Sequence, residues 1–237
     1  MIKLVSSNDF DWSEIPLSLM KVPSTGLDRG WLEKRAGVMC KEIADLRPEQ
    51  GRTLVHVLAI GDTEKTGANR NGDGFSSYWN NKNHYYFTKH AHVYQNHKNH
   101  DPKLSVGGIK LSAYNPEMGR IELVLSLDNV KCAEAVNKLE NGEDIAVSMG
   151  CKVAHDVCSI CGHKAPSPRD YCSHAKLAMG KVLDDGRQVY VDNPDPHHFD
   201  LSVVPRPAER TAFSFRKVAS AAAAMSSTIL FKEAGLM

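Results

Sequence analysis

The sequence lacks an excess of either charge, and it lacks long apolar runs. Its 237 residues carry 29 Lys and Arg against 28 Asp and Glu, so nothing in the overall charge favours a nucleic-acid track or an acidic substrate. No run approaches the roughly 20 apolar residues of a membrane-spanning helix, and the first residues lack the apolar region of a secretory signal. We therefore expect an intracellular protein whose partners include neither membrane nor nucleic acid.

The sequence has an ordinary globular composition, with 42% apolar and 24% charged residues. Apolar residues at helical spacing predict helices over 27–46 and 129–139, the second with Asn129 as its N-cap. Stretches rich in apolar and β-branched residues predict strands at 53–60, 105–114, 120–127, 144–153 and 199–204. The alternation in 120–127 predicts a strand with one buried face, and His56 is interpreted as a core histidine. This mixture of elements indicates an α+β protein.

Most of the cysteines gather in one short stretch beside several histidines. Cys158 and Cys161 form a C-x-x-C turn followed by a glycine, and Cys172 and His174 supply a second pair. Three thiolates and one imidazole suit tetrahedral zinc, and four protein ligands leave no open position for water. We therefore predict a structural zinc ion that holds together the insertion at residues 155–176. The alternative ligands are His163 and His155 for the imidazole and Cys151 for a thiolate.

Two other stretches carry the residues of a candidate hydrolytic site. The polar turn at 95–102 contains His97 and His100, and the strand at 144–153 presents Ser148 between small neighbours. A serine nucleophile requires a base within hydrogen-bond reach and a third group that orients this base. If the strand lies beside the turn, the chain has both a nucleophile and a base.

Four motifs follow one another in a defined order along the chain. They are Tyr-Gln-Asn-His-Lys-Asn-His-Asp-Pro at 94–102, Gly-Gly-Ile-Lys at 107–110, Ala-Val-Ser-Met-Gly at 146–150 and Phe-Asp-Leu-Ser-Val-Val-Pro-Arg-Pro-Ala at 199–208. This ordered set resembles the prohead (capsid maturation) proteases of tailed bacteriophages, which are similar in fold to herpesvirus assemblins. The resemblance covers residues 53–217. It implies a mostly antiparallel β-barrel surrounded by helices, to which this chain adds the small zinc-binding insertion.

The resemblance also implies an activity and a domain organisation. The implied activity is that of a serine endopeptidase whose substrates are the phage scaffold protein and the major capsid protein. The enzyme would act as a homo-oligomer inside the procapsid, in the host cytoplasm. The protease domain would span 1–217, followed by a flexible tail at 218–237. Some members cut after glutamate with a bulky apolar residue two positions before it and a small residue after it. The tail contains Phe-Lys-Glu-Ala, so we predict self-cleavage between Glu233 and Ala234.

Carried over by motif, the nucleophile of the family corresponds to Ser148. The histidine of the family matches either His97 or His100, and we favour His97. For the third member we favour Asp200, which falls where many members of the family carry an acid, two residues before the Ser-x-Val segment. The alternatives are the acids Glu122 and Asp128 and, because assemblins use a second histidine, His155 and His198.

The proposed reaction also requires groups that stabilise the oxyanion. Backbone amides near Met149 and Gly150 are expected to do so, assisted by Arg70 or Arg206. Two other protein classes compete with the protease interpretation. One is a non-enzymatic, zinc-stabilised phage capsid or portal assembly protein. A Ser148 that is buried or lies far from both histidines would favour this class. The other is a zinc-dependent nucleic-acid module or nuclease, against which the neutral charge argues.

Overall fold

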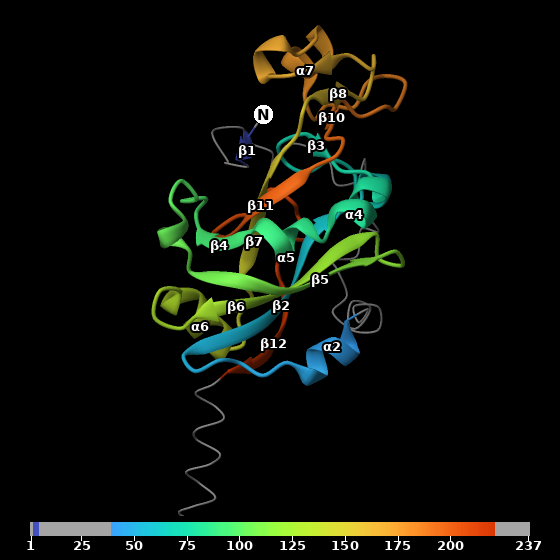
Figure 1. Cartoon of the computed structure of the whole chain (residues 1–237). Coiled ribbons are helices and arrows are strands. Elements are labelled where there is room, and N and C mark those ends of the chain that lie inside the picture. The colour runs from blue at the N-terminus through green and yellow to red at the C-terminus, as the bar shows by residue number, and fades with distance from the viewer. Residues whose placement is uncertain (1, 5–38, 221–237) are drawn as a thin grey trace, which may run out of the picture.

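The computed structural model describes residues 2–4 and 39–220 (Figure 1). Most of the helix predicted at 27–46 lies outside the described residues, and its last part is helix α2 (Cys40–Asp45). The predicted cleavage site at Glu233 and Ala234 also lies outside them.

One curled sheet of eight strands forms the body of the molecule (Figure 1). In spatial order its strands are β1 (Ile2–Leu4), β7 (Ala146–Lys152), β11 (His197–Val204), β4 (His92–Gln95), β5 (Gly107–Asn115), β6 (Arg120–Asp128), β2 (Arg52–Gly61) and β12 (Ser214–Ser220). The β11–β4 pair is parallel, and the other described neighbours in this sheet are antiparallel. The sheet curls far enough that Ala146 at the start of β7 forms a bridge with Phe213, just before β12.

Apolar residues of most strands fill the inside of the curl. Val55, Leu123 and Val147 are fully buried there, together with Phe87 of helix α5. Strand β6 is buried on both faces, so the prediction of one buried face was wrong. The reason is that Val124, on the second face, packs in a separate apolar cluster with residues of the α2 segment.

The helices are few and short. In the described residues they are α2, α3 (Thr63–Thr66), α4 (Ser77–Asn83), α5 (Tyr86–His90), α6 (Ala133–Glu140) and α7 (Ser173–Ala178), with 3₁₀ turns at Pro102–Leu104 and Pro168–Asp170. An α+β fold is therefore confirmed, but these helices do not surround the sheet as the resemblance implied (Figure 1). None of the described helices is long and apolar enough to cross a membrane.

Helix α6 begins later than predicted. The residue before its first turn is Cys132, not Asn129, whose side chain instead accepts a hydrogen bond from Thr53 at 2.8 Å. Asp128 organises the turn before the helix, because its Oδ1 accepts the backbone N–H groups of Val130 and Lys131 at 3.0 Å. The helix N-terminus therefore has no side-chain cap, and Asp128 stabilises the turn that leads into it.

A small lobe is inserted between β7 and β11 (Figure 1). Three of its strands, β10 (Val191–Asp192), β8 (Asp156–Cys158) and β9 (Lys164–Ala165), form a four-stranded sheet together with β3 (Asp73–Gly74), which comes from an earlier part of the chain. The pairing of β10 with β3 ties this lobe to the loop after β2. The predicted insertion at 155–176 lies within the lobe, while β12 continues to Ser220, past the boundary predicted at residue 217.

Candidate functional site

The pairing of β7 with β11 brings Ser148 and Asp200 onto one face of the sheet. Ser148 lies directly opposite Ser202, and Gly150 lies opposite Asp200. Residues directly opposite in an antiparallel pair, and residues two apart on one strand, share a face. The intervening Met149 belongs to the apolar core. The nucleophile and the acid predicted from sequence are therefore neighbours on adjacent strands.

An irregularity in β11 gives Asp200 its position. The register shifts between His198 and Asp200, so the simple alternation of side chains is broken there. His198 consequently packs into the core, where its ring stacks on Phe87 with centroids 4.3 Å apart. Burial lowers the pKa of His198 to about 3, and neither ring nitrogen has a hydrogen-bond partner among the described residues. The structure therefore does not join His198 to His97.

The turn after β4 carries His97 back over β11. Asn96 and His97 both have left-handed backbone angles, with φ of 50° and 55°, which is uncommon for residues other than glycine. Two hydrogen bonds to β11 hold this turn: Asn96 N–H donates to the Val203 carbonyl at 3.0 Å, and His97 N–H donates to Ser202 Oγ at 3.1 Å. Such backbone outliers cluster at functional sites.

The carboxylate of Asp200 is fully buried and accepts three hydrogen bonds. His97 Nδ1 donates to Oδ2 at 2.6 Å, Asn99 Nδ2 donates to the same oxygen at 3.0 Å, and Ser202 Oγ donates to Oδ1 at 2.9 Å. Gly150 leaves the space for this carboxylate, since a Cβ there would lie 3.1 Å from Asp200 Cβ. Sequence reasoning missed Asn99 and Ser202, although both lie inside the quoted motifs.

The other ring nitrogen of His97 is left as a hydrogen-bond acceptor. With the Nδ1 proton donated to Asp200, Nε2 is the acceptor nitrogen of the neutral ring. Nε2 is buried and has no hydrogen-bond partner among the described residues, and the side chain is only 9% exposed. A buried acceptor without a hydrogen bond lowers the stability of the fold unless another group donates to it. Ser148 presents a hydroxyl, a group that could donate to such an acceptor, on the same face of the sheet as Asp200.

Ser148 itself is 4% exposed and lines a narrow pocket beneath the chain that follows β11. The other residues of the pocket are Ala59, Ile60, Asn69, Phe75, Met149, Ala208 and Glu209. Arg70 holds this chain in place, because its Nη1 donates to the Pro207 carbonyl at 2.6 Å and its N–H donates to the Ala208 carbonyl at 3.0 Å. Arg206 is exposed. Arg70 therefore fastens the chain that lines the other side of this pocket.

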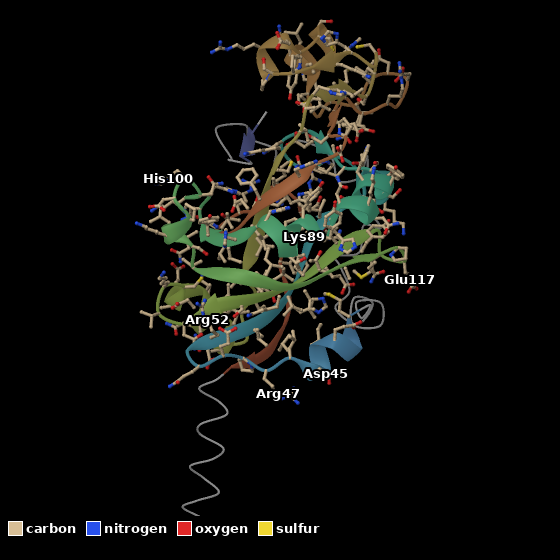
Figure 2. All side chains as sticks on the ribbon, viewed as in Figure 1. Asp45, Arg47, Arg52, Lys89, His100 and Glu117 are labelled. Atoms are coloured by element: carbon tan, nitrogen blue, oxygen red, sulfur yellow. The ribbon has the colours of Figure 1, made fainter. Side chains whose placement is uncertain are left out.

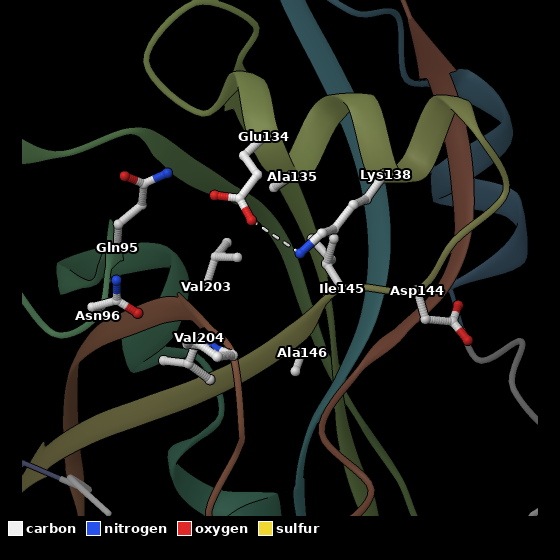
Figure 3. Close-up of a pocket in the computed structure, with 11 residues that line it drawn as sticks. Gln95, Asn96, Glu134, Ala135, Lys138, Asp144, Ile145, Ala146, Val203 and Val204 are labelled. Atoms are coloured by element: carbon white, nitrogen blue, oxygen red, sulfur yellow. Dashed lines mark hydrogen bonds and ion pairs between the residues drawn. The ribbon is translucent and has the colours of Figure 1, made fainter.

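A groove of about 240 Å³ flanks the site between α6 and the strands β7 and β11 (Figure 3). Gln95 and Asn96, which precede His97, form one side, and Glu134 and Lys138 of α6 form the other, joined by an ion pair of 3.0 Å. The apolar part of the lining consists of Ala135, Ile145, Ala146, Val203, Val204 and Pro205. The groove is smaller than typical drug-sized pockets and suits a single side chain.

The other predicted members of the site lie elsewhere. His100 is exposed at the periphery of the molecule (Figure 2). Glu122 is fully buried in a separate network, where its Oε2 lies 2.8 Å from His56 Nε2 and its Oε1 accepts from Asn115 at 2.6 Å. His56 is fully buried, as predicted. Asp128 caps the turn before α6, so neither acid faces His97.

The lobe brings four potential metal ligands together. Ligand atoms of Cys158, Cys161, Cys172 and His174 all lie within 4.8 Å of one another, and the Cys161 and Cys172 sulfurs are 3.5 Å apart. This set of residues could hold a metal ion. His163 is directed elsewhere, because its Nε2 lies 2.8 Å from the carbonyl of Asp170.

The thiol of Cys172 is adapted to its role in this cluster. Although burial alone would raise its pKa, the backbone N–H of Ala175 and the neighbouring cysteines and His174 lower it to about 6. The thiolate is the form that binds metals, so a thiol that ionises readily suits a metal site. Cys151, the alternative thiolate ligand, is buried in the core of the main sheet.

A search of protein-family models, curated proteins and solved structures found no match to this chain. The assignment of a function therefore rests on the residues of the chain and on their geometry.

Proposed function

We propose that the chain is a serine endopeptidase of the phage prohead type, with Ser148 as nucleophile, His97 as base and Asp200 as the group that orients His97. The observation that carries the proposal is the buried His97 ring. Its Nδ1 lies 2.6 Å from Asp200, and its Nε2 is an acceptor without a partner, on the face of the sheet that presents Ser148. Three residues far apart in sequence thereby combine the parts of a catalytic triad.

In the proposed reaction, His97 Nε2 takes the hydroxyl proton as Ser148 Oγ attacks the scissile carbonyl, and then returns this proton to the leaving amine. The buried carboxylate of Asp200 stabilises the imidazolium that forms between these steps. Backbone amides near Met149 and Gly150 are the proposed oxyanion donors. Because Ser148 is 4% exposed, Ala208 and Glu209 have to move before a polypeptide can enter.

Other parts of the molecule are consistent with this proposal. The curled sheet and the bridge between Ala146 and Phe213 support a barrel of the assemblin type. The three thiols and His174 support a structural zinc ion, since four protein ligands complete a tetrahedral site and leave no position for water. The proposed substrates are the scaffold protein and the major capsid protein inside the procapsid, and the chain is also proposed to cut itself between Glu233 and Ala234.

A fluorophosphonate probe tests the nucleophile without knowledge of the substrate. Purified wild-type protein is expected to gain the mass of one adduct on Ser148. The Ser148→Ala and His97→Ala variants are expected to lose labelling, whereas His100→Ala, at an exposed position of the same turn, serves as the matched control and keeps it. Equal labelling of all four proteins would refute the triad.

Co-expression with candidate scaffold and capsid proteins then tests the biological reaction. Wild type is expected to shorten these proteins, and intact mass is expected to show loss of the residues after Glu233, while Ser148→Ala does neither. The burial of Ser148 favours the assembly protein as the second candidate. Absence of both labelling and processing, with the protein retained in procapsids, is the result that supports that candidate.

A further inference from the structure

Strand β7 has two edges, and they are occupied differently. Along one edge, all of β7 pairs with β11. Along the other, the start of β7 meets the chain before β12, where Val147 N–H donates to the Ala212 carbonyl at 3.0 Å. The end of β7, residues 150–152, pairs with β1 (Figure 1). Ser148 therefore lies on the stretch of this edge between two occupied segments.

The direction of β1 is informative. The pair is antiparallel, with Leu4 opposite Gly150 and Ile2 opposite Lys152, so β1 runs toward Ser148. A strand rises about 3.3 Å per residue, which places Ser148 about 7 Å beyond Gly150 along the edge. An extended polypeptide that follows the line of β1 therefore brings a peptide bond to the proposed nucleophile.

We propose that the edge of β7 at residues 150–152 is the main-chain docking site for an extended polypeptide substrate, and that β1 occupies this edge as an internal competitor. The inference rests on the proposed function of Ser148. Addition of a strand to an exposed sheet edge is a common way to bind an extended peptide, because backbone hydrogen bonds supply affinity for many sequences. The substrate class is thus an unfolded segment without proline at the pairing positions.

The competition is expected to be modest in size. β1 is three residues long and is the outermost strand of the described sheet, so it has a partner on one side only. Because ordering the chain offsets most of the gain from its few backbone hydrogen bonds, the net preference for the paired state is that of about one such bond, or about tenfold. Freeing the edge is therefore expected to raise the apparent affinity of an extended ligand by about tenfold.

Two probes, one with a peptide backbone and one without, distinguish binding along β7 from the reactivity of Ser148. Diisopropyl fluorophosphate has no peptide backbone, whereas a tripeptide diphenyl phosphonate has backbone amides that can pair with β7. With either probe, Ser148 Oγ forms a bond to phosphorus and fluoride or phenoxide leaves, while His97 takes the hydroxyl proton. Labelling rates are measured from the intact mass of the full chain.

The test compares Lys3→Pro with Lys3→Ala. Proline removes a backbone N–H and interrupts the pairing of β1, whereas alanine keeps the backbone intact. Lys3→Pro is expected to react about ten times faster than Lys3→Ala with the tripeptide probe, and both are expected to react equally with diisopropyl fluorophosphate. Equal tripeptide rates, or a slower Lys3→Pro, overturn the inference and leave the triad standing. Failure of both probes to label any variant refutes the proposed function and the inference together.

Amide hydrogen exchange in the wild-type protein provides a measurement that does not depend on how the variants fold. In the tripeptide adduct, the amides of Lys3 and Leu4 are expected to lose protection while those of residues 150–152 stay protected. In the diisopropyl adduct, both segments are expected to keep the protection of the free protein. Continued protection of β1 in the tripeptide adduct overturns the inference.

Discussion

Replacement of Asp200 by asparagine removes the buried charge behind His97 while keeping the shape of the side chain. The carboxylate accepts hydrogen bonds from His97, Asn99 and Ser202, whereas an amide has one acceptor oxygen and one donor group. If the amide nitrogen faces His97, the ring must carry its proton on Nε2 and can no longer act as a base. If the oxygen faces His97, the imidazolium formed during the reaction loses its counter-charge.

The expected magnitudes follow from these contacts. With the amide oxygen facing His97, each of the three charge-assisted bonds becomes a neutral one, which costs about 1 kcal/mol per bond and about 3 kcal/mol of folding stability in total. The loss of orientation and charge at a triad histidine lowers the rate by about 10⁴-fold, which corresponds to about 5 kcal/mol of transition-state stabilisation. Asp200→Asn is therefore expected to fold, with a lower stability, and to react very slowly.

The assay is the rate of fluorophosphonate labelling, followed by intact mass, with urea unfolding to measure stability. Asp128→Asn is the matched control, because Asp128 caps a surface turn and is expected to leave the labelling rate unchanged. Glu122→Gln is expected to lower the free energy of unfolding through its network with His56 and to leave the labelling rate unchanged. Labelling of Asp200→Asn at the wild-type rate, or a large loss in Asp128→Asn, would refute the assignment of Asp200.

Two further predictions concern other parts of the chain. Since the pKa of His198 is about 3 in the folded protein and about 6.5 when unfolded, the unfolded state binds the extra proton, and stability is expected to fall as the pH drops below about 6.5. The free energy of unfolding is expected to be about 2 kcal/mol lower at pH 5 for this reason. His198→Phe is expected to remove this part of the pH dependence, measured by urea unfolding at pH 7.5 and pH 5. An unchanged pH dependence in this variant contradicts the prediction. Metal analysis is expected to find about one zinc per chain, lost in Cys161→Ser and retained in His163→Ala; loss in His163→Ala instead would show that the fourth ligand is wrong.

Much of the fold could be predicted because strands leave strong local patterns. The apolar runs that became β2, β6 and β7 were correctly placed, and the spacing of Cys158 and Cys161 pointed to the cluster that the structure assembles. Burial of β6 on its second face could not be predicted, since it depends on packing against α2 from elsewhere in the chain. The helix predicted at 129–139 begins only at Ala133, because Asp128 holds the residues before it in a turn.

The candidate site was predictable by residue type but not by contact. Ser148, His97 and Asp200 were favoured from motifs, yet the face of the sheet that Ser148 and Asp200 share depends on strand register and on an irregularity in β11, which no local pattern reveals. The left-handed angles at Asn96 and His97 occur without a glycine to signal them. Asn99 and Ser202 were missed because short polar residues are common in turns and strands, and only the three-dimensional arrangement shows that both hold Asp200.

The insertion of the lobe between β7 and β11 has a consequence for how the protein folds. The two strands that carry Ser148 and Asp200 form one hairpin, but residues 153–196 separate them, so their pairing has to close a long loop. Contacts inside the lobe, including those among the four potential metal ligands, are shorter in range and can form first, which shortens the loop that remains. We therefore expect refolding to accelerate when zinc is present. A chain made under metal limitation would expose the unpaired edges of β7 and β11 for longer and aggregate more readily.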